Sequence, residues 1–391
     1  MKPTSIERHK SWLRNSFILQ KISKYAKSIN DKLKTNIYGK SPEFFASSKN
    51  YPDISFGSSV SISKPISIHE LFGKSYDEII KARLSNIIAK RYGTPKTFDR
   101  LTEVMQALAM SKKPIYTEVE LSKKPRLLLR LSPNTYPVGP SSPVKRLIEA
   151  ENPKIPKKVY ELYNEKINAE LGVLELYVRG FDYYYIQRLF SAGVLGRNKK
   201  IVPTRWSITA VDGIISKFNK KKVLRNPVIN NIMVFTSYFL FNKFVVLMMP
   251  GPWAFENFEA WAPKTTWGAK NSYLITEEFE SAKGRKTYAE SQAGAYYAVR
   301  NVVLEYLAKI KRQASVVVIR EVYEGYNIPV GVWQIRENVK NALEKEYKKF
   351  ESTKEAEDYI NTLLRIPFKK YKKKSRILRQ SLLTSLIHPI S

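Results

Sequence analysis

Apolar residues recur at a helical period in several parts of the chain and at a strand period in its middle. In residues 6–35, side chains such as Trp12, Ile22 and Leu33 follow the helical period, and Lys and Ser fill the positions between them. This pattern predicts a basic amphipathic helix. Further helices are predicted at residues 75–91, 97–110, 157–171, 182–193, 288–312, 337–350 and 354–364.

Runs of apolar and β-branched residues predict strands, several of them in close succession in the middle of the chain. These strands are predicted at residues 127–131, 173–178, 229–240, 243–250, 252–261, 271–276, 316–321 and 330–335. The short connections within residues 229–276 favour antiparallel pairing. The order of elements predicts an α+β fold, with a mixed, mainly antiparallel sheet packed with several helices and a flexible basic C-terminal tail.

Proline and other turn-forming residues concentrate in residues 132–156, which indicates either a domain boundary or a long loop. Composition changes again near the end of the chain, where Lys and Arg become dense. We therefore divide the chain into a basic N-terminal helix region (1–35), an N-terminal α+β part (36–150), a C-terminal α+β core (151–365) and a basic linker with a terminal tail (366–391).

The chain carries a surplus of positive charge, with 67 Lys and Arg against 35 Asp and Glu and a formal net charge of +32. Such a surplus attracts polyanions, either nucleic acids or anionic membrane surfaces. A uniformly Lys-rich proteome would produce the same balance, so both explanations stay open. Residues 228–250 are the most apolar run, but their Asn, Ser and Lys residues favour two strands around a turn over a membrane span. With no signal peptide evident, we expect a cytoplasmic protein without a membrane partner.

The chain contains no cysteine, which excludes disulfides, thiolate zinc sites and cysteine nucleophiles. Its three histidines, His9, His69 and His388, lie far apart in the sequence. This spacing argues against a histidine metal site and against a Ser-His-Asp triad. We predict no metal site and no cofactor, although a Mg²⁺ ion held by carboxylates alone stays open.

Residues 368–379 are dense in Lys and Arg, and a compact apolar segment follows them. Gln380, Leu383, Leu386 and Ile387 fit the pattern Gln-x-x-aliphatic-x-x-hydrophobic-hydrophobic. One helical turn would group the three apolar side chains into a plug, and the basic run would add electrostatic steering. The pattern resembles the clamp-binding box of replication and repair proteins, whose last two positions are usually aromatic. The alternative is a C-terminal helix that packs on its own domain.

One segment combines basic, aromatic and hydroxyl side chains. Lys199 and Lys200, followed by Arg205 and Trp206, suit contact with a phosphate and stacking on a base. The alternative is a structural strand in which Arg205 pairs with Asp212. Further candidates for nucleic-acid or phosphate contacts are Arg300, Arg320 and Arg336.

Carboxylates among aromatic residues are the candidates for catalysis. Strand alternation places Trp253 and Glu259 on one face and Glu256 on the other. A carboxylate beside tryptophans has a perturbed environment and can act as acid or base; the alternative is a Trp-rich core in which Glu pairs with Arg. The adjacent charges at Arg320-Glu321 indicate a buried polar network. The candidate catalytic residues are Asp212, Glu256, Glu259 and Glu290.

Several segments together resemble the archaeal Nre family of DNA-repair proteins. The resemblance is carried by residues 39–45, Tyr51-Pro52, Gly57, residues 202–212, residues 256–263, Trp267, residues 294–300, Arg320-Glu321 and residues 331–337. It covers nearly the whole chain, and the Pro-Thr-Arg-Trp-Ser-Ile-Thr block is specific. The family is implicated in the response to DNA damage, and many members end in a clamp-binding box. Members often begin with a four-cysteine zinc finger, which a chain without cysteine lacks.

The resemblance implies a process and a partner but no reaction. We expect a DNA-repair factor that binds DNA and docks on the sliding clamp (PCNA) through Gln380, Leu383, Leu386 and Ile387. One alternative is an enzyme that processes a nucleotide or DNA, with the four candidate carboxylates and Arg205 in one pocket. A weaker alternative is an RNA-binding protein. The sequence leaves open whether the protein is an enzyme.

Overall fold

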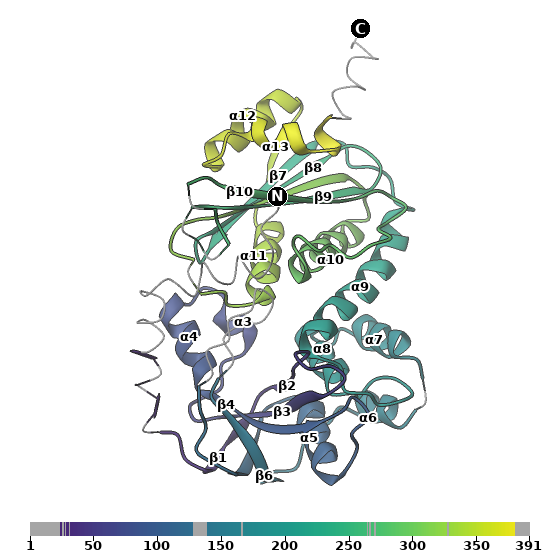
Figure 1. The fold of residues 1–391 in the computed structure, drawn as a ribbon. Coiled ribbons are helices and arrows are strands. Elements are labelled where there is room, and N and C mark those ends of the chain that lie inside the picture. Colours follow the sequence, from purple (N-terminus) through teal and green to yellow (C-terminus); the bar gives the residue numbers. More distant parts are fainter. Residues whose placement is uncertain are drawn as a thin grey trace. The chain divides into compact units, whose positions relative to one another are not determined.

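The computed structural model of the chain divides into two compact units, one ending at Ile215 and one beginning at Ser216. The structure describes residues 24–25, 27, 29–30, 32–127, 139–165, 167–263, 265, 267–269, 271–326 and 328–379. We name the unit that ends at Ile215 the barrel unit and the unit that begins at Ser216 the C-terminal unit. Figure 1 labels their elements. The division falls inside helix α9 (Thr204–Val223). The turn-rich stretch at residues 132–156 instead contains β6 (Ser141–Glu149), which pairs with other strands of the barrel unit.

Five strands of the barrel unit close into a barrel. They are β1 (Asn36–Ser41), β3 (Ile54–Ser61), β4 (Asn86–Gly93), β5 (Ile115–Leu121) and β6, and a short β2 (Phe44–Ala46) also pairs with β3. β1 is antiparallel to both β3 and β5, β3 to β4, and β5 to β6, while β4 and β6 run parallel. Helix α5 (Arg100–Met110) lies between β4 and β5 in the chain. This strand order, with these directions and this helix, is that of the OB-fold.

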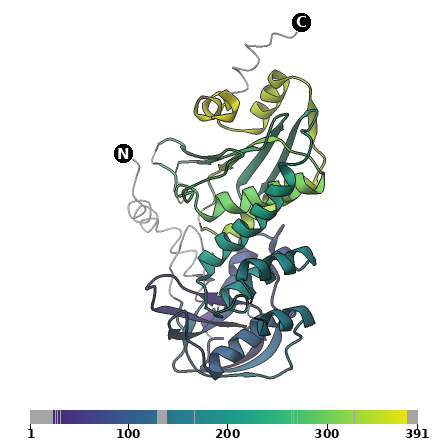
Figure 2. The ribbon, with the colours of Figure 1, turned by 90° about the vertical axis from the view of Figure 1, so that its right-hand side faces the viewer.

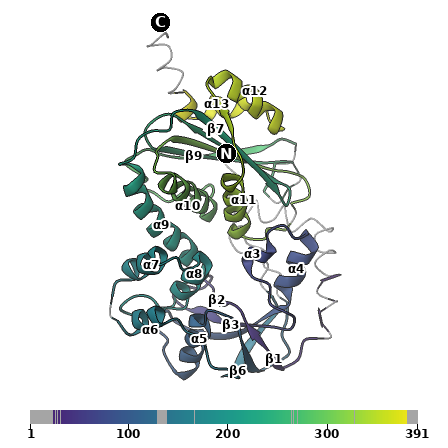
Figure 3. The same cartoon turned by 180° about the vertical axis from the view of Figure 1, so that it is seen from behind.

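Alternation along the strands places the barrel core inside. In β5, for example, Val119 is buried while its neighbour Glu118 is exposed. Helix α5 adds Met105 to the same core, and Figure 3 shows it beside β3 and β6. Asp99 begins this helix by accepting a hydrogen bond of 2.9 Å from the Thr102 amide. The helix predicted at residues 97–110 is therefore confirmed.

The sequence pattern predicted the other helices of the barrel unit only in part. They are α3 (Ile68–Leu71), α4 (Tyr76–Leu84), α6 (Lys157–Asn164), α7 (Ala169–Val178) and α8 (Tyr183–Ser191). The prediction of one helix through residues 75–91 was wrong beyond Leu84, because the following residues form β4 by pairing with β3 and β6. The strand predicted at residues 173–178 was also wrong, since this apolar run forms the second half of α7. Short apolar runs do not separate a buried strand from a buried helix.

The C-terminal unit contains a six-stranded sheet in the order β10-β9-β11-β8-β7-β12. Its strands are β7 (Ile232–Phe239), β8 (Asn242–Met249), β9 (Ala254–Trp261), β10 (Leu274–Glu280), β11 (Ser315–Val322) and β12 (Lys348–Phe350). β9 and β11 are parallel, and the other pairs are antiparallel. The mixed, mainly antiparallel α+β fold and the strands predicted at residues 229–261 are confirmed.

Helices cover both faces of this sheet, as Figure 2 shows from the side. They are α10 (Gly294–Lys309), α11 (Val332–Glu344), α12 (Thr353–Leu363) and α13 (Phe368–Lys374). Phe244 and Val246 of β8 pack in one core with α10 and α11. Val245 and Leu247 face the other way, into a core with α12 and the C-terminal segment. Strand alternation therefore fills two cores from one strand.

The strand predicted at residues 330–335 was wrong, because these residues enter α11. Gly331 has φ +99°, a left-handed conformation that suits glycine, and the helix begins at the next residue. Val332, Trp333 and Val339 are buried along it. Most of the helix predicted at residues 6–35 and of the strand at residues 127–131 lies outside the described residues. Among the described helices, none has the length and apolar character needed to span a membrane.

Candidate nucleic-acid interface and charged clusters

The segment with Arg205 and Trp206 begins a helix rather than forming a strand. Thr204 starts α9, and its Oγ1 accepts a hydrogen bond of 2.9 Å from the Ala46 amide, which fixes the helix start to β2. Just before it, the Ile201 amide donates to the Pro95 carbonyl at 2.9 Å, close to the end of β4. The motif therefore lies against the barrel at the end of β4.

Trp206 is exposed and contacts a second exposed aromatic residue. Its ring centroid lies 4.8 Å from that of Tyr51, which belongs to the loop between β2 and β3. Trp206 is 43% exposed and Tyr51 is 52% exposed. Arg205 is also exposed. Two segments separated by about 150 residues of sequence thus form one aromatic surface, which is a chemistry suited to stacking on bases.

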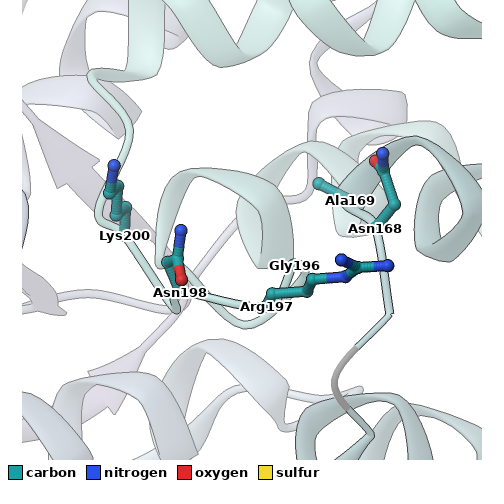
Figure 4. A pocket seen from close by; sticks show the side chains of 6 residues that line it. All are labelled: Asn168, Ala169, Gly196, Arg197, Asn198 and Lys200. Carbon is teal, nitrogen blue, oxygen red and sulfur yellow. The ribbon is translucent and has the colours of Figure 1, made fainter.

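The two lysines of the motif differ in their surroundings. The Lys199 ammonium lies 3.6 Å from the centroid of the Tyr163 ring, and burial lowers the pKa of Lys199. Lys200 is exposed and lines a pocket of about 340 Å³ with Arg197 and the start of α7 at Asn168. In Figure 4, Arg197 extends toward the start of α7 and Lys200 stands at the other end of the loop. Of the two lysines, Lys200 is the one open to a phosphate.

Arg320 and Glu259 form a buried ion pair. The Arg320 Nη1 donates to Glu259 Oε1 at 2.6 Å, and its Nε donates to Asn242 Oδ1 at 2.8 Å. Both charged side chains are almost fully buried. The guanidinium also lies 5.0 Å from the Trp261 ring centroid. The Glu among tryptophans is therefore paired with Arg, as the architectural alternative expected.

Arg300 is held in a second buried cluster. Its Nη1 donates to Glu280 Oε2 at 2.7 Å, while Lys220 Nζ donates to Glu280 Oε1 at 3.2 Å. Burial alone would raise the pKa of Glu280, but the charges of Arg300 and Lys220 outweigh it and hold that pKa below its usual value. Arg336 is also buried. Of these three candidates in the C-terminal unit, Arg320 and Arg336 are thus buried and Arg300 is half-buried, and Arg300 and Arg320 are paired with buried carboxylates.

Glu256 holds the backbone that follows α13. Its Oε1 accepts from the Arg376 amide at 2.8 Å, and its Oε2 accepts from the Ile377 amide at 3.4 Å and from the Ser375 hydroxyl. Burial raises the pKa of Glu256 to about 7, with a further rise from the nearby Glu277 carboxylate, against the hydrogen bonds that lower it. These contacts fix a segment of chain and leave the carboxylate with a structural role.

Glu321 performs the same task before α13. This buried carboxylate of β11 accepts from the Arg365 amide at 2.8 Å and from the Ile366 amide at 3.0 Å. It also accepts from the hydroxyls of Tyr371 and Tyr323, both at 2.8 Å. The sequence indicated a polar network at Arg320-Glu321 but not that Glu321 holds the C-terminal segment, because nothing local in the sequence links these distant residues.

The four candidate catalytic residues do not share a pocket in the structure. Glu256 and Glu259 lie on opposite faces of β9, Asp212 is buried in α9 of the barrel unit, and Glu290 is exposed in the loop before α10. In the part of the chain that the structure describes, no group of three His, Asp or Glu side chains is placed to hold a metal ion. The four clamp-box residues, Gln380, Leu383, Leu386 and Ile387, lie outside the described residues.

Comparison with known proteins identifies the family. The model of the archaeal Nre N-terminal region matches residues 13–268, and that of the archaeal Nre C-terminal region matches residues 280–387. The chain therefore belongs to the archaeal Nre family. No solved structure matches it.

Two relatives show the extent of the similarity. The DNA repair protein NreB of Archaeoglobus fulgidus is 35% identical over 279 residues, which cover 71% of each chain. The DNA repair protein NreA of Haloferax volcanii is 34% identical over 357 residues, which cover 86% of this chain and 85% of the relative. The similarity thus extends through both structural units.

Proposed function

We propose that this protein is a DNA-repair factor that binds DNA and docks on the sliding clamp (PCNA) through Gln380, Leu383, Leu386 and Ile387. Its relatives are named DNA repair proteins, which supports the process. The family match extends to residue 387, so the segment with the clamp-box pattern belongs to the matched region. The net charge of +32 supports contact with a polyanion.

The observation that carries the proposal is the anchoring of the chain immediately before the box. Glu321 holds the amides of Arg365 and Ile366 before α13, and Glu256 holds those of Arg376 and Ile377 after it. Two buried carboxylates thus fix the segment that ends at residue 379. A docking peptide attached at residue 380 would transmit its contact with the clamp to the folded unit.

The same segment presents a row of cations. Residues 369–379 contain seven Lys and Arg and no acidic residue. In α13, Phe368 and Tyr371 are buried, whereas Lys369, Lys373 and their neighbour Lys374 are exposed. If the tail docks on a clamp that encircles DNA, these exposed cations would be available to contact phosphates beside the clamp.

Titration of the purified sliding clamp with the full chain, followed by calorimetry, tests the docking. We expect a chain lacking residues 380–391 to lose clamp binding, and the Leu383→Ala/Ile387→Ala variant to lose at least about tenfold in affinity, because buried apolar anchors dominate such contacts. Leu382→Ala is the matched control, since this neighbouring leucine stands outside the pattern. Equal binding by the full and shortened chains would contradict docking through the box.

A competition assay separates DNA binding from the RNA-binding alternative. Labelled DNA bound to the full chain is displaced with unlabelled DNA or RNA of the same sequence. We expect DNA to compete better than RNA. Equal or better competition by RNA would favour the RNA-binding alternative, and absence of DNA binding would overturn the proposed function.

A further inference from the structure

The barrel unit has the strand order of a fold whose second and third strands, with the adjoining loops, bind oligonucleotides in many proteins. In this chain those strands are β3 and β4, and the loop between the first and second barrel strands includes residues 47–53. Fold alone does not assign a function. The side chains on this face decide whether the barrel can bind a nucleic acid.

The outer face of β3 and β4 carries small, aromatic and cationic residues. Ser55 pairs with Tyr92, and Gly57 pairs with Lys90. Strand alternation turns these four positions away from the core, in which Phe56 is fully buried. Tyr92 is exposed and Ser55 and Lys90 are half-buried, whereas Gly57 is covered. Tyr92 is 67% exposed, so its ring is accessible to a binding partner. The open part of this face is therefore its end with Ser55 and Tyr92.

The aromatic pair Tyr51 and Trp206 lies at the same end of these strands. Tyr51 stands three residues before β3, whose first residues Ile54 and Ser55 pair with Gly93 and Tyr92. Trp206 contacts Tyr51, with the ring centroids 4.8 Å apart at an angle of 56°. The tilted rings leave faces open, in agreement with their exposed fractions. The three exposed aromatic residues therefore belong to segments that meet at one end of the barrel.

The same segments also carry cations. Lys200 directly precedes Ile201, whose amide donates a hydrogen bond to the Pro95 carbonyl just beyond β4. Arg205 directly precedes Trp206, and Lys90 lies on β4 itself. The loop at residues 47–53 adds one cation and one anion, Lys49 and Asp53. A surface that combines aromatic rings with cations suits a strand of nucleic acid whose bases are unpaired and whose phosphates are charged.

The opposite side of the barrel has a different character. There, β1 and β5 place Tyr38 and Tyr116 outward, but the two rings stack on each other at 5.1 Å and 9°. Glu118 and Glu120 of β5 are outward on the same surface. Charges of both signs occupy this face, since Lys145 pairs with Glu120 at 3.2 Å and the Lys40 ammonium lies 4.9 Å from the Tyr116 ring centroid. Tyr38, whose ring is stacked on Tyr116, provides an internal control with an exposed tyrosine of the same fold.

We propose that Tyr51, Tyr92 and Trp206 form a platform on which unpaired bases of single-stranded DNA stack, with Lys200 and Arg205 contacting its phosphates. The identity of the polymer as DNA rests on the proposed function. A platform of this kind binds with little sequence preference, because every base has a face on which an aromatic ring can stack. The protein would then recognise single-stranded regions exposed during repair.

The test is fluorescence anisotropy of labelled oligo(dT) titrated with the full chain at fixed salt. We expect Tyr51→Ala, Tyr92→Ala and Trp206→Ala each to weaken binding by about 5- to 150-fold, as expected for loss of one stacked base. Trp206→Phe should retain most of the affinity, because a ring remains. Tyr38→Ala is the matched control and should bind as the unchanged protein does. Thermal unfolding of each variant shows whether it is folded.

The outcomes separate this inference from the proposed function. Folded variants at Tyr51, Tyr92 and Trp206 that bind oligo(dT) as tightly as Tyr38→Ala does would overturn the platform. Binding of duplex DNA and of the clamp without binding of oligo(dT) would overturn the platform alone. Absence of binding to either form of DNA would overturn the proposed function as well.

Discussion

The C-terminal unit and the barrel unit place their charged and aromatic residues differently. In the C-terminal unit, Arg320 and Arg300 are paired with the buried carboxylates Glu259 and Glu280. In the barrel unit, Trp206 and Tyr92 are exposed, as are Lys200 and Arg205 of the segment that contains Trp206. The contrast teaches that dense Arg, Glu and Trp in a sequence can indicate either a core network or a binding surface. Burial and pairing decide between them.

The largest expected effect concerns the anchor of the C-terminal segment. Glu321→Ala removes the acceptor of two backbone amides and two tyrosine hydroxyls, so we expect a loss of about 4–6 kcal/mol in the free energy of unfolding. Urea unfolding measures it. Glu324→Ala is the matched control, because Glu324 contacts the same Arg365 at the surface, at 2.9 Å. It should cost less than about 1 kcal/mol. Equal effects of the two variants would contradict the anchoring role.

Breaking the Glu259–Arg320 pair is expected to have the next largest effect. Arg320→Met leaves a buried carboxylate without its partner and should cost about 3–5 kcal/mol in unfolding free energy. Glu259→Leu with Arg320→Met should recover much of that loss, since neither charge then remains buried. DNA affinity of the double variant should equal that of the unchanged protein. A stable double variant with much weaker DNA binding would instead make Arg320 a phosphate contact.

A smaller effect is expected from the pH dependence of Glu256. Its pKa in the folded protein is raised to about 7 from an ordinary value of 4.5. The folded state therefore binds more protons between these values, and the stability that this contributes is present below pH 4.5 and lost as pH rises through about 7. Glu256→Gln removes the titrating group, so its free energy of unfolding should lack this decline between about pH 4.5 and pH 7, measured by urea unfolding over this range. Parallel pH profiles of the two proteins would contradict the raised pKa.

Local sequence patterns predicted the strands that alternate or form continuous apolar runs, as in β7, β8 and β9. They did not predict that residues 330–335 join α11, because a short apolar run fits a buried helix equally well. Closure of the barrel was also beyond the local pattern. It depends on pairings such as that of β1 with β5, whose partners are distant in the chain.

The candidate site shows the same limit. The sequence singled out Arg205 and Trp206 as a surface for phosphates and bases, but not their proximity to Tyr51, which only the tertiary fold creates. It proposed Glu256 and Glu259 as acids or bases, and the structure assigns them partners on other strands and on the C-terminal segment. Residue type and spacing in the sequence indicate which chemistry a side chain can perform. The partners of that side chain in the folded protein determine whether it performs this chemistry or holds the structure together.

The central claim, that the exposed cations of this chain bind DNA phosphates, is tested most directly by the salt dependence of DNA affinity. The affinity of the full chain for oligo(dT) and for duplex DNA is measured by anisotropy from about 50 mM to about 300 mM salt. If about four phosphates are neutralised, the logarithm of the binding constant for oligo(dT) falls with the logarithm of salt concentration with a slope of about −3, and duplex DNA gives a steeper slope. A DNA affinity that does not change over this range would contradict the claim.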